Sequence, residues 1–354
     1  MSETPAKSAA VASPASASSG SPAKADPKLT YVASQWPHNS PLISCRFDPK
    51  GRFVLAGAQD RTVQRWELAT SKKLPALVGH ESWVRAIGFL PDGETTITGG
   101  YDGHLIWWPT SAEKAAQIRN IEAHNGWVRC VSISPDGQRI ATGGNDKLVK
   151  VWNAADGKLI RDLTGHDSHV YSVLHHPDGK SLLSGELMGK VLHWEVESGK
   201  LLHTFDAGDL HTYNDGQKTN YGGVRTMALS PDGKYLACGG LFKATNPFGA
   251  VQDPLVLLFD WQSQKKVQSH LAAGDLKGII WRVVYHRDGF LIGGSGGAAG
   301  GVDLFWKPEQ VNEFHRFALP NTVLDLDLSP DGLQLATAHY DRNLRISRMT
   351  PKPT

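Results

Sequence analysis

The chain has 354 residues, of which 37 are Lys or Arg and 35 are Asp or Glu, giving a formal net charge of +2. A chain this close to neutral has no overall electrostatic attraction to nucleic-acid backbones or anionic lipid, although it can still carry a local basic patch. No stretch approaches the roughly 18 consecutive apolar residues of a membrane-spanning helix, so we expect no membrane segment. The cysteines Cys45, Cys130 and Cys238 are too few and too scattered for a disulfide framework or a zinc cage, and their apolar neighbours favour buried, unreactive thiols.

The first 28 residues consist mainly of Ala, Ser, Pro and Lys and contain no aromatic side chain. Such a segment cannot bury enough apolar surface to offset its conformational entropy, so we predict a disordered tail over residues 1–28. Its one short apolar run is shorter than the core of a secretory signal peptide. The sequence therefore favours a cytoplasmic protein.

Seven turn tetrapeptides divide the rest of the chain, at a spacing of 42–44 residues except before the fifth and the sixth. Short alternating apolar runs flank them, such as WVRCVSIS before the third turn and QRIATGG after it, and this pattern indicates β-strands joined by hairpin turns. No amphipathic helix of convincing length appears. The turns are DPKG at 48–51, LPDG at 90–93, SPDG at 134–137, HPDG at 176–179, SPDG at 230–233, HRDG at 286–289 and SPDG at 329–332.

A repeat of about 40–45 residues with four short strands cannot cover both faces of its own sheet, whereas a closed ring of such sheets can. The chain resembles the WD-repeat β-propeller family over residues 29–349. The resemblance implies an all-β, seven-bladed WD-repeat β-propeller with four-stranded antiparallel blades, followed by a C-terminal tail at 350–354. It rests on the SPDG turns, the Asp of a tight turn, the Trp that closes a third strand, and the pairs Gly79-His80 and Gly165-His166.

The order of the strands also predicts how the ring closes. The seventh repeat ends at its third strand, NLRISRM, with only five residues after it. The segment LTYVASQW, residues 29–36, precedes the first repeat in the position of an outermost strand. We therefore predict that this N-terminal strand completes the last blade and closes the ring.

The resemblance implies a buried hydrogen-bonded set within a blade: a His before the first strand, a Ser or Thr on the second, the tight-turn Asp and the terminal Trp. The carboxylate can accept from an imidazole N–H, and the hydroxyl can bridge to the indole N–H. Because the sets recur in several repeats, we interpret them as hydrogen bonds that stabilise each blade and not as a catalytic triad. The two complete sets are His80, Thr98, Asp102 and Trp108, and His124, Thr142, Asp146 and Trp152.

Other repeats depart from this pattern. The sixth is rich in glycine, GGSGGAAGG at 293–301, which favours a tight or bulged strand connection and not a phosphate-binding loop. The substituted positions are Ala56 for the hydroxyl of the first repeat, Met188 for the Asp of the fourth, Phe259 for the Trp of the fifth, and Leu319 and Ser347 for the His and Trp of the seventh.

Two long insertions, 206–222 and 241–254, are predicted to lie on the face that carries the turns between second and third strands. The family's interaction positions lie on the same face, and here they carry Trp, Tyr and Arg, which dominate interface hot spots. The alternative is that these aromatic side chains only pack between blades and line the channel mouth. The candidate partner-binding residues are Trp83, Arg85, Tyr101, Trp127, Arg129, Asn145, His169, Tyr171, Arg225, Trp281 and Tyr340.

We therefore expect a non-catalytic scaffold or adaptor that binds a protein or peptide partner, needs no cofactor or metal, and is monomeric by itself but part of a larger assembly. One alternative is nucleic-acid binding through Arg85, Arg129 and Arg225. A weaker one is a small-ligand or metal-dependent enzyme that uses the loop 206–223, although its acidic and His spacing matches no rigid ligand template. That loop carries Asp206, Asp209, His211 and Asp215.

Overall fold

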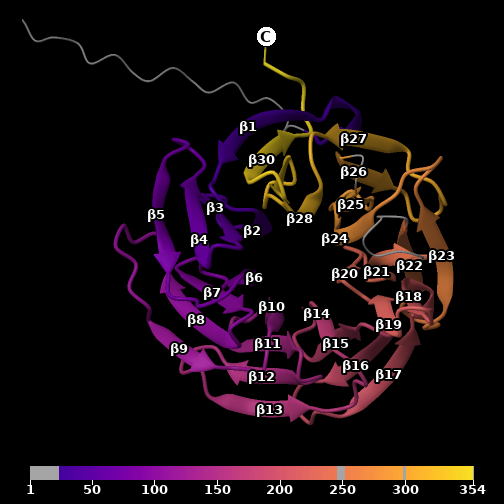
Figure 1. Cartoon of the computed structure of the whole chain (residues 1–354), viewed down its shortest axis with the longest axis horizontal. Helices are drawn as coiled ribbons and strands as arrows, with labels where there is room; N and C mark the ends of the chain where they lie inside the picture. Colours follow the sequence, from indigo (N-terminus) through magenta and orange to yellow (C-terminus); the bar gives the residue numbers. More distant parts are fainter. Residues whose placement is uncertain (1–23, 245–251, 298–299, 354) are drawn as a thin grey trace, which may run out of the picture.

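The computed structural model describes residues 24–244, 252–297 and 300–353. Within these ranges the strands form seven four-stranded antiparallel sheets arranged as blades around a common axis (Figure 1). The predicted seven-bladed all-β propeller is confirmed. In the described part of the chain, no helix is long and apolar enough to cross a membrane.

The blades follow the repeats of the sequence, from an innermost strand to an outermost one. Blade 1 contains β2 (Leu42–Phe47), β3 (Phe53–Ala58), β4 (Thr62–Glu67) and β5 (Lys73–Val78). Blade 2 contains β6 (Val84–Phe89), β7 (Thr95–Gly100), β8 (His104–Pro109) and β9 (Arg119–Glu122). Blade 3 contains β10 (Val128–Ile133), β11 (Arg139–Gly144), β12 (Val149–Asn153) and β13 (Leu159–Leu163). Blade 4 contains β14 (Val170–His175), β15 (Ser181–Glu186), β16 (Lys190–Glu195) and β17 (Leu201–Asp206).

Several strands of blades 5 and 6 are longer, with seven or eight residues. Blade 5 contains β20 (Thr226–Leu229), β21 (Tyr235–Phe242), β22 (Asp253–Asp260) and β23 (Lys266–Leu271). Blade 6 contains β24 (Ile279–Tyr285), β25 (Leu291–Gly297), β26 (Gly300–Trp306) and β27 (His315–Leu319). Blade 7 contains β28 (Val323–Leu328), β29 (Gln334–His339), β30 (Asn343–Arg348) and, as its outermost strand, β1 (Tyr31–Pro37).

The N-terminal strand closes the ring as predicted. β1 pairs antiparallel with β30, so the two ends of the chain share one sheet. The indole of Trp36 on β1 stacks on that of Trp66 in blade 1, with ring centroids 5.6 Å apart. Because this strand covers the edge of β30, it removes an exposed strand edge from the ring.

The chain is ordered before the predicted boundary at residue 29. Residues 27–29 form a short 3₁₀ helix, η1 (Pro27–Leu29), Ala25 is buried, and the backbone N–H of Asp26 donates to the carbonyl of Met349 at 2.8 Å. The predicted boundary is therefore wrong for residues 24–28, which pack against the C-terminal end of blade 7. Residues 1–23 lie outside the described residues.

Each of the seven predicted turns joins the first and second strands of a blade. The last residue of each turn is a glycine with a φ between +66° and +87°, a region that strains any residue with a side chain. These glycines are Gly51, Gly93, Gly137, Gly179, Gly233, Gly289 and Gly332.

The two complete hydrogen-bonded sets form as predicted. In blade 2 the Nδ1 of His80 lies 2.9 Å from a carboxylate oxygen of Asp102, its Nε2 lies 2.8 Å from the hydroxyl of Thr98, and the indole N–H of Trp108 donates to that hydroxyl at 2.8 Å. The equivalent set built on His124 has distances of 2.7–2.9 Å. The hydroxyls of Thr98 and Thr142 are fully buried, so these sets tie the strands of a blade together and offer no access to a substrate.

A glycine two residues after the hydroxyl leaves room for each complete set. A Cβ on Gly144 would lie 2.4 Å from the Nδ1 of His124 and 2.9 Å from the carboxylate of Asp146. In two blades a larger polar residue stands at this position, and its side chain makes contacts that belong to the set. In blade 4 that residue is Glu186, and in blade 7 it is His339.

These two side chains replace the members that the sequence pattern lacks. The carboxylate of Glu186 lies 3.3 Å from the Nδ1 of His166 and accepts the backbone N–H of Ser168 at 2.8 Å, so the fourth blade has a buried carboxylate despite Met188. In the seventh blade His339 bridges the hydroxyl of Thr337 and the carbonyl of Asn321, at 2.8 Å each.

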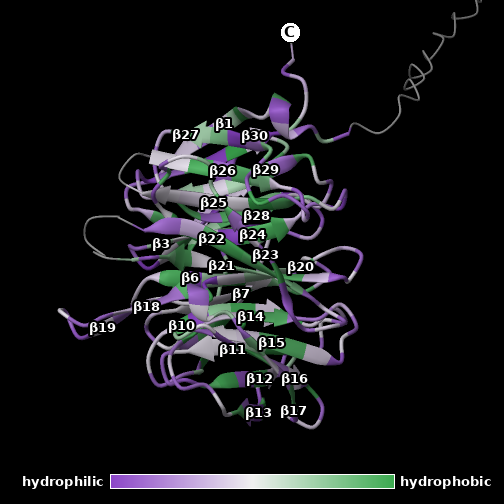
Figure 2. Cartoon of the chain, turned by 90° about the vertical axis from the view of Figure 1, so that its right-hand side faces the viewer, coloured by the Kyte–Doolittle hydropathy of each residue, from purple (hydrophilic) through white to green (hydrophobic). Residues whose placement is uncertain are grey.

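Both insertions fold in part as strands. Residues 206–222 contain a second 3₁₀ helix, η2 (Gly208–Leu210), and a hairpin of β18 (His211–Asn214) and β19 (Thr219–Gly222) that projects from one face (Figure 2). The ends of 241–254 extend the β21–β22 ladder to the pair Phe242 and Asp253, and residues 245–251 lie outside the described residues. By strand order, both insertions lie at the end of the blades opposite the seven turns, as predicted.

Candidate functional site

One residue on the innermost strand of each blade, or directly before it, lies at the mouth of the central channel. In six blades a register shift between the first and second strands skips that residue, as in a β-bulge. A bulge re-aims the side chain of the extra residue away from the alternating pattern. In blade 5 the equivalent residue is Arg225, which directly precedes β20. The other six are Ile43, Arg85, Arg129, Tyr171, Trp281 and Leu324.

Three aromatic residues from blades 2 and 3 stack in a row beside this ring. The rings of Trp83 and Tyr101 have centroids 5.8 Å apart, and those of Tyr101 and Trp127 are 4.0 Å apart and nearly parallel. Trp83 is 43% exposed and Trp127 is 40% exposed. This row places three large aromatic side chains at the surface in a fixed arrangement.

Arginine and aromatic side chains alternate from the end of that row. The guanidinium carbon of Arg129 lies 4.9 Å from the ring centroid of Trp127 and 4.3 Å from that of Tyr171. Arg225 lies 4.9 Å from Tyr171 and 4.8 Å from Trp281. Arg85 lies 5.8 Å from Trp281. Each contact is within the range of cation–π attraction.

We call this surface the rim and define it by Trp83, Arg85, Tyr101, Trp127, Arg129, Tyr171, Arg225, Trp281 and Tyr340. Tyr340 is 60% exposed and shares an apolar hollow with Trp83, Tyr101 and Trp281. The structure therefore brings together nine of the eleven predicted partner-binding residues.

The other two predicted residues lie beside the rim. The amide oxygen of Asn145 accepts a hydrogen bond from the Nε of Arg129, so Asn145 orients this arginine. His169 is half-buried; burial, reinforced by the charges of Arg129 and Lys147, lowers its pKa. Its imidazole is therefore neutral at physiological pH.

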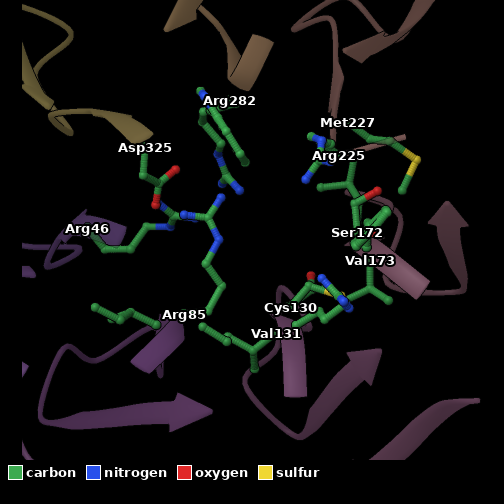
Figure 3. Close-up of a pocket in the computed structure, with 17 residues that line it drawn as sticks. Arg46, Arg85, Cys130, Val131, Ser172, Val173, Arg225, Met227, Arg282 and Asp325 are labelled. Carbon is green, nitrogen blue, oxygen red and sulfur yellow. The ribbon is translucent and has the colours of Figure 1, made fainter. Parts of the chain in front are cut away.

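The channel below the rim contains charged residues that the sequence reasoning missed. Arg46 and Asp325 form an ion pair of 2.7 Å, and Arg282 lines the same cavity (Figure 3). Asp325 also accepts the backbone N–H of Cys45 at 3.0 Å, and Asp327 accepts that of Phe47 at 2.8 Å. These bonds join blade 7 to blade 1 on the inner side of the closure.

A signal for these residues exists in the sequence. The first strand of the last repeat, VLDLDL, places two aspartates on one side of an alternating strand, and the strands LISCRF and IIWRVVY each carry one arginine. Within a single repeat, each of these charged residues is only an isolated departure from the repeat pattern. Ring closure brings them together, so their proximity is a property of the assembled propeller.

The cysteines are free and protonated. Burial raises the pKa of all three thiols, that of Cys130 to about 12. Cys45 and Cys238 are buried as predicted, whereas Cys130 is half-buried because it borders the channel.

The polar residues of the loop 206–223 do not gather into a cluster. His211 hydrogen-bonds with Asn220 at 2.8 Å, Asp215 pairs with Lys218, and Asp209 pairs with Lys266 on β23. Across the described ranges, no group of three or more His, Cys, Asp or Glu side chains could hold a metal ion.

A seven-bladed ring of four-stranded sheets with buried His, Thr, Asp and Trp sets defines a β-propeller of the repeat type. The family model described as "WD domain, G-beta repeat" matches residues 30–67, 71–109, 115–153, 157–194, 209–241 and 307–346. The chain therefore belongs to the WD-repeat family. Blade 6 lies largely outside these matches, which agrees with its glycine-rich, divergent sequence.

Individual relatives align over single stretches of the chain. A small ribosomal subunit protein RACK1y of Oryza sativa is 35% identical over 75 residues, 20% of this chain and 22% of its own. A Lissencephaly-1 homolog of Heterostelium pallidum is 42% identical over 48 residues, 14% of this chain and 12% of its own. The nuclear distribution protein PAC1 of Coccidioides posadasii is 31% identical over 85 residues, 23% of this chain and 18% of its own. The alignments cover less than a quarter of each relative.

Proposed function

We propose that the protein is a non-catalytic adaptor that binds a protein or peptide partner through the rim. The observation that carries the proposal is the pre-stacked row of Trp83, Tyr101 and Trp127. Large aromatic side chains at a surface expose apolar area to water, and covering them with a partner recovers that free energy. Since the rings already hold one another in place, a partner that covers them loses little side-chain entropy on binding.

The arginines of the rim suit a peptide. A guanidinium group that stacks on an aromatic ring keeps its N–H donors at the ring edge available for a carboxylate or a peptide carbonyl. Trp, Tyr and Arg are also the residues that most often dominate binding energy at interfaces. The hairpin β18–β19, whose Tyr213 is 50% exposed, lies on the same face and would enlarge the contact area.

The proposal involves no catalysis and no cofactor. The hydroxyl, imidazole and carboxylate groups that resemble a catalytic triad are hydrogen-bonded to one another within the blades. The hydroxyls of Thr98 and Thr142 are buried. A cytoplasmic location and a role within a larger assembly remain expectations from the sequence.

Single-stranded nucleic acid is the second candidate, because Arg85, Arg129 and Arg225 alternate with aromatic rings at the rim. These guanidinium groups border a narrow channel instead of following an open groove, which favours a peptide. A nucleic-acid ligand would show binding that weakens steeply with salt, whereas capture through stacked aromatic rings would depend on salt much less.

Site-specific photo-crosslinking tests the proposed face. A crosslinking amino acid in place of Tyr340, at the rim, should form partner adducts in cells. The same amino acid in place of Lys158, on the turn between β12 and β13 at the opposite end of the blades, should form none. Adducts from position 158 without adducts from position 340 would contradict the proposal.

A further inference from the structure

The channel below the rim holds more positive than negative charge. Five arginines line it or its mouth, Arg46, Arg85, Arg129, Arg225 and Arg282, and the nearby acids are Asp325 and Asp327. Burial raises the pKa of Asp327, while the charges of Arg46 and Arg282 outweigh burial and keep the pKa of Asp325 low. The five guanidinium groups outnumber the two carboxylates by three, so positive charge is in excess in the channel.

Three of these arginines already have hydrogen-bond acceptors. Arg46 pairs with Asp325, Arg85 donates to the carbonyls of Ile43 and Leu324, and Arg129 donates to Asn145. Arg225 and Arg282 have none among the described residues, and the Nε of each is buried without a partner. A buried charged donor without an acceptor is costly, so these two groups call for a ligand or for ordered water.

The arginines also repel one another. Figure 3 shows the guanidinium groups of Arg46, Arg85 and Arg282 turned toward one another beside Asp325, with Arg225 across the channel. Burial, with added repulsion from Arg46, lowers the pKa of Arg282 to about 10, and burial also lowers the pKa of Arg225. A negative ligand between them would relieve this repulsion.

We propose that the channel binds a doubly charged oxyanion of the phosphate class, with Arg225 and Arg282 as its principal ligands. Planar guanidinium groups donate in pairs to such oxygens. A carboxylate would supply one charge, whereas a phosphate group supplies about two and comes closer to the excess charge of the channel. The cavity volume of about 110 Å³ admits a phosphate group but is below the roughly 300 Å³ of a site for a whole nucleotide or cofactor.

Arg225 also belongs to the rim, whereas Arg282 lies in the channel below it, so a free anion can bind without capture of a partner by the rim. The same chemistry has two sources: a free inorganic anion, or a phosphorylated side chain that enters between Arg225, Trp281 and Arg85 at the mouth. The same arginines would bind the anion in both cases. A free anion would be surrounded by water, whereas a phosphorylated side chain would also bring the rest of its peptide to the mouth.

Thermal unfolding of the full chain at constant ionic strength tests the anion site. Replacing chloride with about 10 mM phosphate or sulfate should raise the Tm by at least roughly 3 °C, and acetate should not. Arg225→Gln and Arg282→Gln should each lose this rise. The control Arg348→Gln, an exposed arginine at the end of β30, should keep it. An equal rise in all four chains, or an equal effect of acetate, would overturn the proposal.

Arg225→Gln also loses the stacking of this arginine on Tyr171 and Trp281, which can destabilise the fold. Arg282→Gln therefore provides an independent test. In chloride at low ionic strength this variant should melt higher than the parent, because burial of the charge and its repulsion by Arg46 and Arg85 outweigh its attraction to Asp325 and Asp327. A lower Tm together with an unchanged response to phosphate would contradict the assignment of Arg282.

Calorimetric titration distinguishes the two sources. The probes are inorganic phosphate, a capped Ala-phosphoserine-Ala peptide and the same peptide without phosphate. A phosphopeptide Kd at least tenfold below that of phosphate identifies a phosphorylated side chain, and an equal or tighter Kd for phosphate identifies a free anion. Equal binding of both peptides, or no binding of either phosphate probe, overturns the proposal. Since no partner protein is present, a failure here leaves the proposed function of the rim open to its own test.

Discussion

The indole ring of Trp127 lies flat on the phenol ring of Tyr101, with centroids 4.0 Å apart and planes 3° apart. Tyr101 follows the last residue of β7 in blade 2, and Trp127 directly precedes β10 in blade 3. This contact therefore crosses a blade boundary and makes the rim one continuous surface. Aromatic stacking contributes about 0.5–1.5 kcal/mol beyond the area it buries.

Deletion of the N-terminal strand should destabilise the ring. A chain that lacks residues 1–23 should melt like the parent, because it keeps the contacts that Ala25 and Asp26 make with the end of blade 7. A chain that lacks residues 1–36 loses the partner of β30 and uncovers Trp66, so it should aggregate and melt at a lower temperature. Light scattering and calorimetry report both effects. A soluble 1–36 deletion with the parent Tm would show that β1 does not close the ring.

Asp146→Ala should destabilise the protein by about 1–3 kcal/mol. The carboxylate accepts the imidazole N–H of His124 at 2.8 Å and the backbone N–H groups of Asn125 and Leu148. Its removal leaves a buried donor without an acceptor. Denaturant unfolding measures the change, with Asp156→Ala on an exposed turn as the control. Equal stability of the two variants would contradict the structural role of the set.

Met188→Asp by itself should leave stability within about 0.5 kcal/mol of the parent, because Glu186 already supplies the carboxylate of blade 4. The sequence pattern alone suggests that an aspartate at this position completes the set. Glu186→Gly should cost about 1–3 kcal/mol, and the double variant with Met188→Asp should recover part of that loss by rebuilding the set found in blades 2 and 3. No recovery in the double variant would show that the two carboxylates do not occupy one space.

Asp303 should make stability fall as the pH rises. Its side chain is fully buried without a hydrogen-bond partner in the described residues, and burial raises its pKa to about 8 from an ordinary value of 3.8. The folded protein therefore keeps a proton that the unfolded chain releases near pH 4. Stability decreases between about pH 4 and pH 8, with a slope of up to about 1.4 kcal/mol per pH unit. Asp303→Asn, which imitates the protonated acid, should lose this contribution and be the more stable chain at pH 8. Parallel pH profiles of the two chains would contradict the raised pKa.

The local spacing of residues predicted most of the fold. Asp146 and Trp152 stand six residues apart on one strand and its turn, so their relation can be read within one repeat. The rim was also predictable, because positions such as Arg85 and Arg129 occupy the same register in successive repeats. Periodic positions are visible in the sequence even when the contacts between them are not.

Contacts that break the periodicity could not be predicted in the same way. Glu186 and His339 replace a missing partner from a position where the complete sets of blades 2 and 3 have glycine, and this requires knowing which space the glycine leaves free. Arg46, Arg282 and Asp325 come from three different blades and meet because the ring closes. No single repeat contains more than one of these three residues, so a site that three repeats share cannot be recognised from the pattern of any one of them.

The most direct test of the account is partner capture by the double variant Trp127→Ala with Arg129→Ala. This change removes the central stacked pair of the rim, and hot-spot truncations of this kind cost about 2 kcal/mol or more per residue. The matched control is Lys158→Ala with Lys200→Ala, two exposed positions at the opposite end of the blades. Both chains should retain the circular dichroism of the parent. We expect the rim variant to lose the partner and the control to retain it; loss in the control with capture intact in the rim variant would contradict binding through the rim.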